Sequence, residues 1–404
     1  MIDRIHFMQK VRPFIGTDVI KVITGMRRCG KSVFLSQIQS EIKRMRGKDA
    51  IFVSISLEDD ENGRFLKKGV LYDHVNRLLK ANPKKTVYVF LDEIHDVEEW
   101  ERCVNSLRMR KNADIYITGS NSKLLSGELA TYLTGRYVEI KVSPYSFAEF
   151  CEASSATFET LSREESFRRY LEFGGMPFLA NLGYRAEWTK VYLEDVFSSI
   201  LLKDVARRGK IRDIDLLNRV VRYVMTEAGH TFSAASIVRY LKHEGRPCTV
   251  DTVLNYLTLC EEAFLFTRVP REDLIGRKVL AVDEKFYVTD HGMRRAMVGG
   301  SVQQDIDQML ENLVCGELLR RGWKVSVGRV QAKEIDFVAG RGDDKRYYQV
   351  AYLMPDENVR KREFGAFEGL KDGFSRFVVS MDPVDMSSNG IRHMNICDFL
   401  LQSE

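Results

Sequence analysis

Apolar residues in the first 150 positions form short runs that alternate with segments of helical length. Segments such as Lys31–Arg46 and Glu98–Arg110 are long enough for helices, and the second has apolar residues at helical spacing. The runs between them are rich in Val, Ile and Phe and predict five strands: Val19–Thr24, Ile51–Leu57, Thr86–Leu91, Ile115–Thr118 and Tyr137–Val142. Strands of this composition that alternate with helices favour a parallel sheet covered on both faces. The predicted fold class of this part is therefore α/β.

The pattern changes after Pro144. Residues 145–225 have helical patterning with few strand signals, and Gly174–Pro177 interrupts it. Residues 231–290 predict a helix, a turn, a second helix from about Val250 and then two strands. That order is typical of a winged helix, although a short helical hairpin beside a β-ribbon would give the same pattern.

A further unit begins near Val302, where a predicted helix runs to Arg321 and is followed by four predicted strands. This part is expected to have an α+β fold. The chain is therefore predicted to have four parts: an α/β domain at 1–150, a helical lid or linker at 151–230, a winged-helix-like domain at 231–298 and a final domain at 299–404.

Length and composition limit the classes of protein to consider. A chain of 404 residues is long enough for several domains. The net charge of only +4 gives no reason to assume a charge-driven affinity for nucleic acid. The seven cysteines have no paired short spacing, which favours reduced thiols. The first residues lack the apolar run of a signal peptide, and no run is long enough to span a bilayer. We expect a cytoplasmic protein without a membrane partner.

A phosphate-binding loop is the clearest motif. The pattern G-x-x-x-x-G-K-[ST] is matched at each fixed position by Gly25, Met26, Arg27, Arg28, Cys29, Gly30, Lys31 and Ser32, and Val33 continues into the helix. The motif follows a predicted strand and opens a predicted helix, as the chemistry requires. Glycines let backbone N–H groups wrap a phosphate, and the helix N-terminus adds positive potential. Lys31 would contact the β- and γ-phosphates, while the Ser32 hydroxyl would bind Mg²⁺. A nucleoside triphosphate, ATP in the leading hypothesis, is the expected ligand.

An acidic pair ends the third predicted strand, at Asp92 and Glu93. Asp92 is predicted to hold Mg²⁺ through water, and Glu93 to orient or deprotonate the attacking water. Without the phosphate loop, the pair would instead suggest a cap for the following helix.

Two further polar positions complete the candidate site. Ser120 and Asn121 follow the fourth strand, where Asn121 could hold the attacking water or sense the γ-phosphate. Either residue could also cap a helix predicted at Lys123–Leu133. Arg136, before the fifth strand, is placed as an arginine finger that would act on a neighbouring subunit; the alternative is an exposed surface arginine. A finger would imply a homo-oligomer.

Cys29 lies inside the loop, near Lys31 and a helix N-terminus. Positive potential there predicts a lowered thiol pKa and a thiol that nucleotide protects from alkylation. The alternative is a small residue that fits the loop.

These motifs resemble the prokaryotic AAA-type ATPases that carry a characteristic C-terminal domain of uncharacterised function. The similarity is found in ITGMRRCGKS, VFLDEIHDVEEW and TGSNSKLLSGELATYLTGRYVEIKVSPYSFAEF, and further along in FGGMP, YLEDVFSSILLKDVARR and EIDFV. The resemblance implies a five-stranded AAA core, a helical and winged-helix middle and a restriction-endonuclease-like end. It implies nucleotide-site roles for Gly25, Gly30, Lys31, Ser32, Asp92 and Glu93, and identifies Arg136 as the arginine of an L-x-G-R motif.

The C-terminal part has a pattern similar to the two-carboxylate, one-lysine site of restriction-type nucleases. Glu311 and Glu317 lie on a predicted helix, and Asp336 lies on a strand. Gln349 and Ala351 stand where that site has its second carboxylate and its lysine, so the charge that a hard cation requires is reduced. Lys361 could supply the missing ammonium. We expect a degenerate nuclease site at Glu311, Asp336 and Gln349.

The second helix of the winged-helix-like part contains Asp251, Glu261 and Glu262 but neither Lys nor Arg. A DNA-reading helix normally carries cations, so a protein partner is as consistent with this part as DNA. A basic cluster at Lys203, Arg207, Arg208 and Lys210 could touch phosphates or form a solvated helix face. The leading hypothesis is a Mg²⁺-dependent ATPase that acts as a switch or small motor. The alternatives are an ATPase that gates a nuclease and a module that holds nucleotide without turnover.

Overall fold

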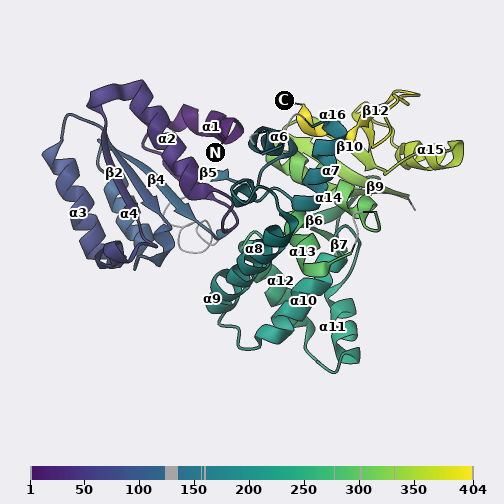
Figure 1. The fold of residues 1–404 in the computed structure, drawn as a ribbon, viewed down its shortest axis with the longest axis horizontal. Helices are drawn as coiled ribbons and strands as arrows, with labels where there is room; N and C mark the ends of the chain where they lie inside the picture. The colour runs from purple at the N-terminus through teal and green to yellow at the C-terminus, as the bar shows by residue number, and fades with distance from the viewer. Residues whose placement is uncertain are drawn as a thin grey trace. The chain divides into compact units, whose positions relative to one another are not determined.

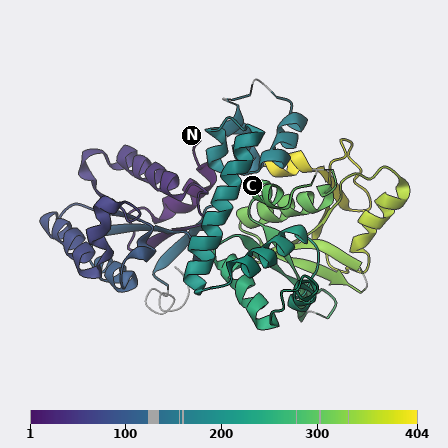
Figure 2. The same cartoon turned by 60° about the horizontal axis from the view of Figure 1, so that its bottom comes forward.

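The computed structural model describes residues 2–122, 135–155, 157–158, 161–276, 278–300, 303–331 and 333–402 (Figures 1 and 2). The predicted helix at Lys123–Leu133 lies outside these residues. The residues group into two compact units: 1–144 with 262–264, and 145–261 with 265–404. The finer division of the second unit at 230 and 298 stays a prediction.

The first unit contains a five-stranded sheet in which each neighbouring pair is parallel, in the order β2-β3-β4-β1-β5. This confirms the predicted α/β fold. The strands are β1 (Ile20–Thr24), β2 (Ile51–Ser56), β3 (Val87–Asp92), β4 (Ala113–Gly119) and β5 (Tyr137–Lys141). The α-helices are α1 (Ile5–Val11), α2 (Lys31–Arg46), α3 (Lys68–Ala81) and α4 (Trp100–Arg108).

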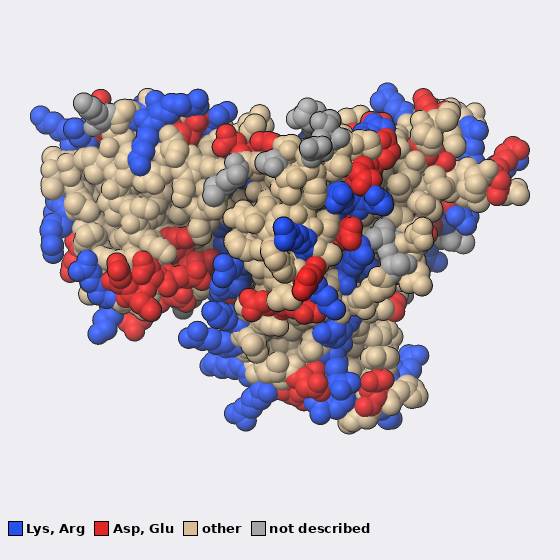
Figure 3. Space-filling view, in the orientation of Figure 1, with Lys and Arg blue, Asp and Glu red and all other residues tan. Residues whose placement is uncertain are grey.

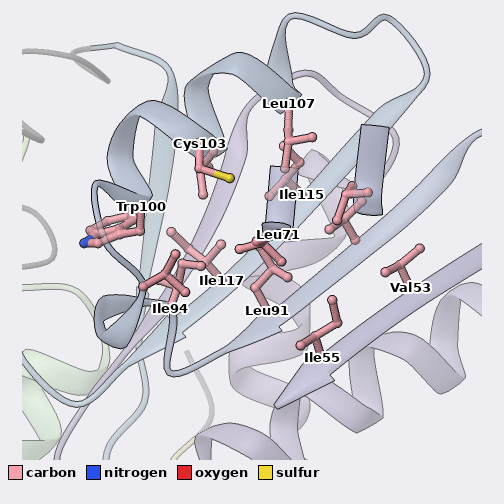
Figure 4. Packing of buried hydrophobic residues seen from close by; sticks show 14 of the residues in the cluster. Val53, Ile55, Leu71, Leu91, Ile94, Trp100, Cys103, Leu107, Ile115 and Ile117 are labelled. Carbon is pink, nitrogen blue, oxygen red and sulfur yellow. The ribbon is translucent and has the colours of Figure 1, made fainter. Parts of the chain in front are cut away.

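Alternate residues of these strands face two different cores, because successive side chains of a strand point to opposite faces. On one face, Leu71 of α3 and Trp100, Cys103 and Leu107 of α4 pack against strand residues such as Ile117 (Figure 4). On the other face the rings of Phe90 and Tyr116 are stacked, with centroids 4.6 Å apart. Apolar and aromatic side chains therefore cover both faces of the sheet, so the polar groups of the predicted nucleotide site are expected at the strand ends.

A buried ion pair joins β1 to β4 on the face of the sheet that carries Phe90 and Tyr116. Lys21 and Asp114 are 0% and 1% exposed, and the Lys21 ammonium donates to the Asp114 carboxylate. Tyr116 donates a second hydrogen bond to Asp114, at 3.0 Å. Burial lowers the pKa of Lys21 and raises that of Asp114, while each opposes the shift of the other. The hydrophobic pattern of these strands does not reveal this pair.

Helices fill the first part of the second unit. A π-helix, Ile200–Ala206, continues α8 and leads into the basic segment around α9, where Lys and Arg side chains are visible in Figure 3. The α-helices are α6 (Phe147–Ser154), α7 (Arg163–Phe173), α8 (Ala186–Ser199), α9 (Arg207–Gly209), α10 (Ile214–Thr226), α11 (Ala234–His243), α12 (Val250–Glu262), α13 (His291–Val298), α14 (Ile306–Arg320), α15 (Glu357–Phe364) and α16 (Ile396–Leu401). None of the described helices of the chain is both long and apolar enough to cross a membrane.

The second unit also contains a mixed seven-stranded sheet, in the order β12-β11-β10-β9-β8-β6-β7. The ribbon expected to be a wing is part of this sheet, because β6 pairs in parallel with β8 at Arg271–Asp273. The strands are β6 (Phe266–Asp273), β7 (Lys278–Val288), β8 (Lys324–Val330), β9 (Lys333–Arg341), β10 (Asp344–Val350), β11 (Ser375–Ser380) and β12 (Ile391–Asn395). The ribbon and the C-terminal strands thus form one hydrogen-bonded layer.

The break predicted at Gly174–Pro177 follows α7, and its first residues contact the start of α13. Gly174 ends α7 with φ +78°, and a Cβ there would lie 2.7 Å from Oδ1 of Asp290. Asp290 is buried and accepts hydrogen bonds from the N–H groups of Gly175 and Met293, at 2.8 and 2.7 Å. The glycine at 174 is therefore required by the close approach of a carboxylate that caps α13.

Candidate nucleotide-binding site

The loop at residues 25–30 connects β1 to α2 and turns sharply. Gly25 has φ +144°, and a Cβ there would lie 2.2 Å from the carbonyl oxygen of Val142. Gly30, at φ +99°, is the N-cap of α2 and offers no capping side chain. The first N–H groups of a helix lack intrahelical partners, so this end of α2 is suited to an anion. The loop therefore has the backbone that a phosphate requires.

Lys31 lies across the loop and is 5% exposed. Its ammonium donates to the carbonyl oxygens of Gly25 and Met26, at 3.2 and 3.3 Å. The same Nζ lies 3.5 Å from Oε1 of Glu93. The loop, the lysine and the predicted water-activating glutamate are thus brought together.

Thr118 of β4 organises the acidic pair at the end of β3. Its hydroxyl donates to the carboxylate of Asp92 and accepts the backbone N–H of Glu93 at 2.9 Å. Glu93 has a left-handed backbone, φ +53°, and accepts the N–H of Ser120 at 3.1 Å on Oε2. Sequence reasoning missed Thr118. Its position at the end of the strand neighbouring β3 was the available signal.

Burial raises the pKa of Glu93; the nearby ammonium of Lys31 opposes this shift, and the charge of Asp92 adds to it. A raised pKa makes a carboxylate a better proton acceptor. His95 was also missed, although it follows Glu93 by two positions, and its Nδ1 lies 3.2 Å from Oε2 of Glu93. Arg27 and Glu58 form an ion pair of 3.1 Å beside these groups.

The oxygen ligands predicted for Mg²⁺ are accessible in different degrees. Ser32, in the first turn of α2, is exposed, and Asp92 is half-buried at the end of β3. A hydroxyl and a carboxylate are ligand types that suit Mg²⁺. Their roles, and those of Val33 and the other loop residues in nucleotide binding, stay predictions.

Asn121 and Arg136 lie in different parts of the sheet. Asn121 is 1% exposed and follows the carboxyl end of β4, at the same edge as the loop. Arg136 is exposed, and its carbonyl oxygen accepts the N–H of Ile20 at the start of β1. The five residues of β1 therefore separate it from the loop, about 16 Å at the rise of a strand. Arg136 cannot reach its own loop and could contact phosphate only in another subunit.

The thiol of Cys29 corrects the sequence prediction. Cys29 is 0% exposed, and its Sγ lies 3.3 Å from the carbonyl oxygen of Val142, behind the loop. Burial raises the pKa of the thiol, although Lys31 and Arg4 act in the opposite direction. The prediction of a lowered pKa was wrong because desolvation outweighs the positive potential. Arg4 donates to the carbonyl oxygens of Cys29 and Ser143, at 3.3 and 2.7 Å, and so supports the loop from behind.

The expected degenerate nuclease site forms a cluster in the second unit. Asp336 accepts the N–H of Val350 at 2.8 Å, and its own N–H donates to the Gln349 side chain at 3.4 Å. Gln349 donates in turn to Glu363 of α15, at 3.1 Å. Burial, together with the charge of Glu311, raises the pKa of Asp336 well above its usual value. The Asp336 carboxylate and the Gln349 amide oxygen are thus each bonded to a backbone N–H group, and the Gln349 amide nitrogen to Glu363.

Lys285 of β7 supplies the cation of this cluster. Its ammonium lies 3.3 Å from Glu311 and 2.8 Å from Glu334, and Tyr287 donates to Glu311 at 3.1 Å. Burial lowers the pKa of Lys285, but the three carboxylates around it outweigh this effect and raise it. Among the described residues, no group of three or more His, Cys, Asp or Glu side chains is arranged to hold a metal ion.

Two residues considered for this cluster lie elsewhere. Glu317 pairs with Arg320 and Arg321, both at 2.6 Å. Lys361 is exposed and pairs with Glu357 at 3.0 Å. The ammonium beside Glu311 and Glu334 is that of Lys285, and a catalytic role for Lys361 stays a prediction.

Two family models match the chain, an AAA domain at residues 17–151 and a domain of unknown function (DUF8612) at residues 164–304. An uncharacterized protein of Haemophilus influenzae is 34% identical over 403 residues, which cover 100% of this chain and 99% of that protein. The uncharacterized protein MJ1544 of Methanocaldococcus jannaschii is 31% identical over 370 residues, which cover 87% of this chain and 79% of that protein.

Solved structures are more distant. The Orc1 protein of Aeropyrum pernix in complex with DNA is 12% identical, with a TM-score of 0.31, over 74% of this chain and 92% of that one. AMPPCP-bound DnaA of Aquifex aeolicus is 14% identical, with a TM-score of 0.32, over 63% and 86%. The chain belongs to the family of AAA-domain P-loop proteins that carry a C-terminal domain of unknown function.

Proposed function

We propose that this protein is a Mg²⁺-dependent ATPase whose nucleotide state controls its C-terminal unit. The observation that carries the proposal is the position of the Glu93 carboxylate, 3.5 Å from the ammonium of Lys31 at the end of the strand beside the phosphate loop. A module that only held nucleotide would not need a buried carboxylate with a raised pKa at this place.

The residues would act in a simple order. The loop N–H groups and Lys31 bind the β- and γ-phosphates, with Lys31 exchanging its carbonyl partners at Gly25 and Met26 for phosphate oxygens. Ser32 and Asp92 would hold Mg²⁺, which supplies positive charge to the phosphates when bound. Glu93 orients the attacking water and accepts its proton, and Thr118 keeps Asp92 and Glu93 in register.

Control of the second unit would pass through an assembly of subunits. Arg136 is exposed at the sheet edge opposite to the loop, so a role in catalysis requires a neighbouring copy. We therefore propose that hydrolysis occurs in a homo-oligomer. The partner of the second unit, DNA or protein, would be released or engaged when the γ-phosphate is lost.

Steady-state ATP turnover tests the proposal, with and without DNA. Glu93→Gln should lower kcat about 10²–10⁴-fold while nucleotide still binds. Glu98→Gln is the matched control, because Glu98 is exposed and only its backbone N–H has a described hydrogen bond, to Leu66. Wild-type turnover in Glu93→Gln would contradict the proposal. DNA cleavage that is lost in Asp336→Ala would favour the nuclease-gating alternative.

A further inference from the structure

Three residues from the middle of the chain, 262–264, belong to the first unit, although the chain on either side of them belongs to the second. They end α12 and precede β6. Phe264 is 4% exposed, and the ammonium of Lys141 at the end of β5 lies 4.9 Å from the centroid of its ring. The chain therefore leaves the second unit, places one aromatic ring in the first unit and returns directly.

The backbone of Phe264 is in the left-handed region, with φ +58°, which is unfavourable for a bulky residue. The N–H of Leu265 donates to the carbonyl oxygen of Cys260 at 2.9 Å and so closes the end of α12. In this type of helix end, Phe264 occupies the position at which glycine is preferred. A glycine would end α12 without the strain. The helix end therefore does not account for the phenylalanine, whereas the contact made by its ring does.

The end of β5, which contacts this ring, also lies against the phosphate loop. Lys141 is the last residue of β5 and pairs with Thr24, the last residue of β1 before the loop. The next residue, Val142, donates its N–H to the carbonyl oxygen of Thr24 at 2.8 Å. The carbonyl oxygen of Val142 lies 3.3 Å from Sγ of Cys29 and 2.2 Å from the place of a Cβ on Gly25. Two consecutive residues thus contact the ring and the loop.

Nucleotide binding would change the contacts of the loop at this point. The ammonium of Lys31 donates to the carbonyl oxygens of Gly25 and Met26, and in the proposed function phosphate oxygens replace these acceptors. Gly25 is packed against Val142 so closely that even a Cβ would collide. Because closely packed groups transmit strain to one another, a shift of Gly25 is expected to reach Val142 and the end of β5.

We propose that Phe264 is the residue through which the phosphate loop and the second unit influence one another, with Lys141 holding its ring at the end of β5. The inference rests on the proposed function, because it names the route by which the nucleotide state reaches the second unit within each copy of the chain. α12 ends next to Phe264 and β6 begins two residues after it, so a shift of Phe264 acts on both elements. The strained backbone fits this role, because such strain is concentrated at switch regions.

Hydrogen exchange followed by mass spectrometry on the full-length chain tests this, with Mg²⁺ and either ADP or a non-hydrolysable ATP analogue. Exchange in peptides that cover residues 250–273 reports the opening of α12 and β6. Protection there should differ about fivefold or more between the two nucleotides, which is the lower end of the coupling factors between sites. The difference should be lost in Phe264→Gly, in which glycine keeps the conformation that ends α12.

Substitutions of Lys141 test the same contact without removing a buried side chain, because Lys141 is exposed. The difference in protection should become smaller in Lys141→Met and return in Lys141→Arg, since a guanidinium also binds the face of an aromatic ring. Lys43→Met is the matched control and should keep the full difference. Lys43 is an exposed lysine in the last turn of α2, and its ammonium lies 5.3 Å from the ring centroid of Phe52. Nucleotide affinity should be the same in all these variants.

Exchange in the loop itself, residues 25–33, separates this inference from the proposed function. A loop that responds to the ATP analogue while residues 250–273 do not would overturn the inference and leave the ATPase proposal intact. The full difference in Phe264→Gly would also overturn it. If Phe264→Gly does not fold, the full difference in Lys141→Met has the same meaning. No response in either segment, together with no ATP turnover, would overturn the proposed function and the inference with it.

Discussion

Each unit of this protein buries carboxylates beside a lysine, and the two arrangements differ in what holds the lysine. Lys31 is bound mainly by carbonyl oxygens of its own loop and lies 3.5 Å from a single carboxylate, next to an exposed hydroxyl and an open helix end. Lys285 pairs with Glu311 and Glu334, and the Tyr287 hydroxyl donates a hydrogen bond to Glu311. A loop carbonyl can be exchanged for a ligand oxygen, whereas a largely buried carboxylate such as Glu311 cannot lose its lysine without cost.

Lys31 therefore lies in a site that can bind a ligand, whereas Lys285 belongs to an ion-pair cluster that stabilises the fold. Lys31 can exchange its carbonyl partners for ligand oxygens, while Lys285 links β7 to α14 and β9 through its ion pairs. Substituting the two lysines in the same way is the most direct way to test this difference.

The largest effect on stability is expected from substitution of Lys285. Lys285→Met should lower the free energy of unfolding by up to about 3–5 kcal/mol, because it leaves the largely buried Glu311 without its lysine, while Glu334 keeps Arg271 at 3.0 Å. ATP hydrolysis per folded molecule should change little. Chemical denaturation followed by circular dichroism measures the first quantity. Lys361→Met is the control, since its exposed pair with Glu357 should contribute about 0–1 kcal/mol. Equal stability of the two variants would show that Lys285 does not stabilise the fold more than an exposed lysine does.

The reactive site should respond in the opposite way. Lys31→Met should reduce ATP turnover about 10²–10³-fold, as removal of a preorganised donor to the transferred phosphate does in other enzymes. Its unfolding free energy should stay closer to that of the wild type than that of Lys285→Met. A coupled ATPase assay and the same denaturation experiment give both numbers. A variant that retains turnover would place the phosphate contact elsewhere.

The pH dependence of turnover should follow the ionisation of Glu93. Burial raises its pKa above the ordinary 4.5, and only the ionised form can accept a proton from water. The rate should therefore rise with pH through the raised pKa and fall about tenfold per unit below it. kcat measured between pH 4 and 8, about the range in which a buried glutamate titrates, gives the midpoint. Glu93→Gln should lack this acid limb, and a limb that persists there would assign it to another group.

The smallest effect concerns the thiol behind the loop. Cys29 should react with iodoacetamide more slowly than the half-buried Cys248, because the attacking species is a thiolate and burial disfavours it. Adding ATP with Mg²⁺ should change the rate at Cys29 little. Mass spectrometry of time points reports both sites in one sample. Rapid labelling of Cys29 that ATP abolishes would instead support the sequence prediction of a reactive thiol protected by nucleotide.

Much of the first unit could be predicted from the sequence because its signals are local. The phosphate loop needs glycines at fixed spacing between a strand and a helix, and Gly25 and Gly30 occupy the conformations that this spacing implies. Asp92 and Glu93 could be placed because parallel strands end at one edge of a sheet. Thr118 could not be predicted in this way, because its role depends on β4 lying next to β3, and the residue pattern of one strand does not indicate its neighbour in the sheet.

The second unit was harder because its contacts are long-range. Lys285 meets Glu311 only because β7, β6 and β8 share a sheet that α14 covers, and neither periodicity nor composition specifies that strand order. β12 was not predicted since Ile391–Asn395 is short and largely polar.

The parallel pairing of β6 with β8 has a consequence for synthesis of the chain on the ribosome. About 50 residues separate Asp273, the end of β6, from Lys324, the start of β8. Until β8 emerges, β6 presents one edge without a partner, and such an edge is open to pairing with other chains. A stalled or truncated product that ends between these strands is therefore expected to be the aggregation-prone form, so expression of shortened versions should succeed only when β8 is included.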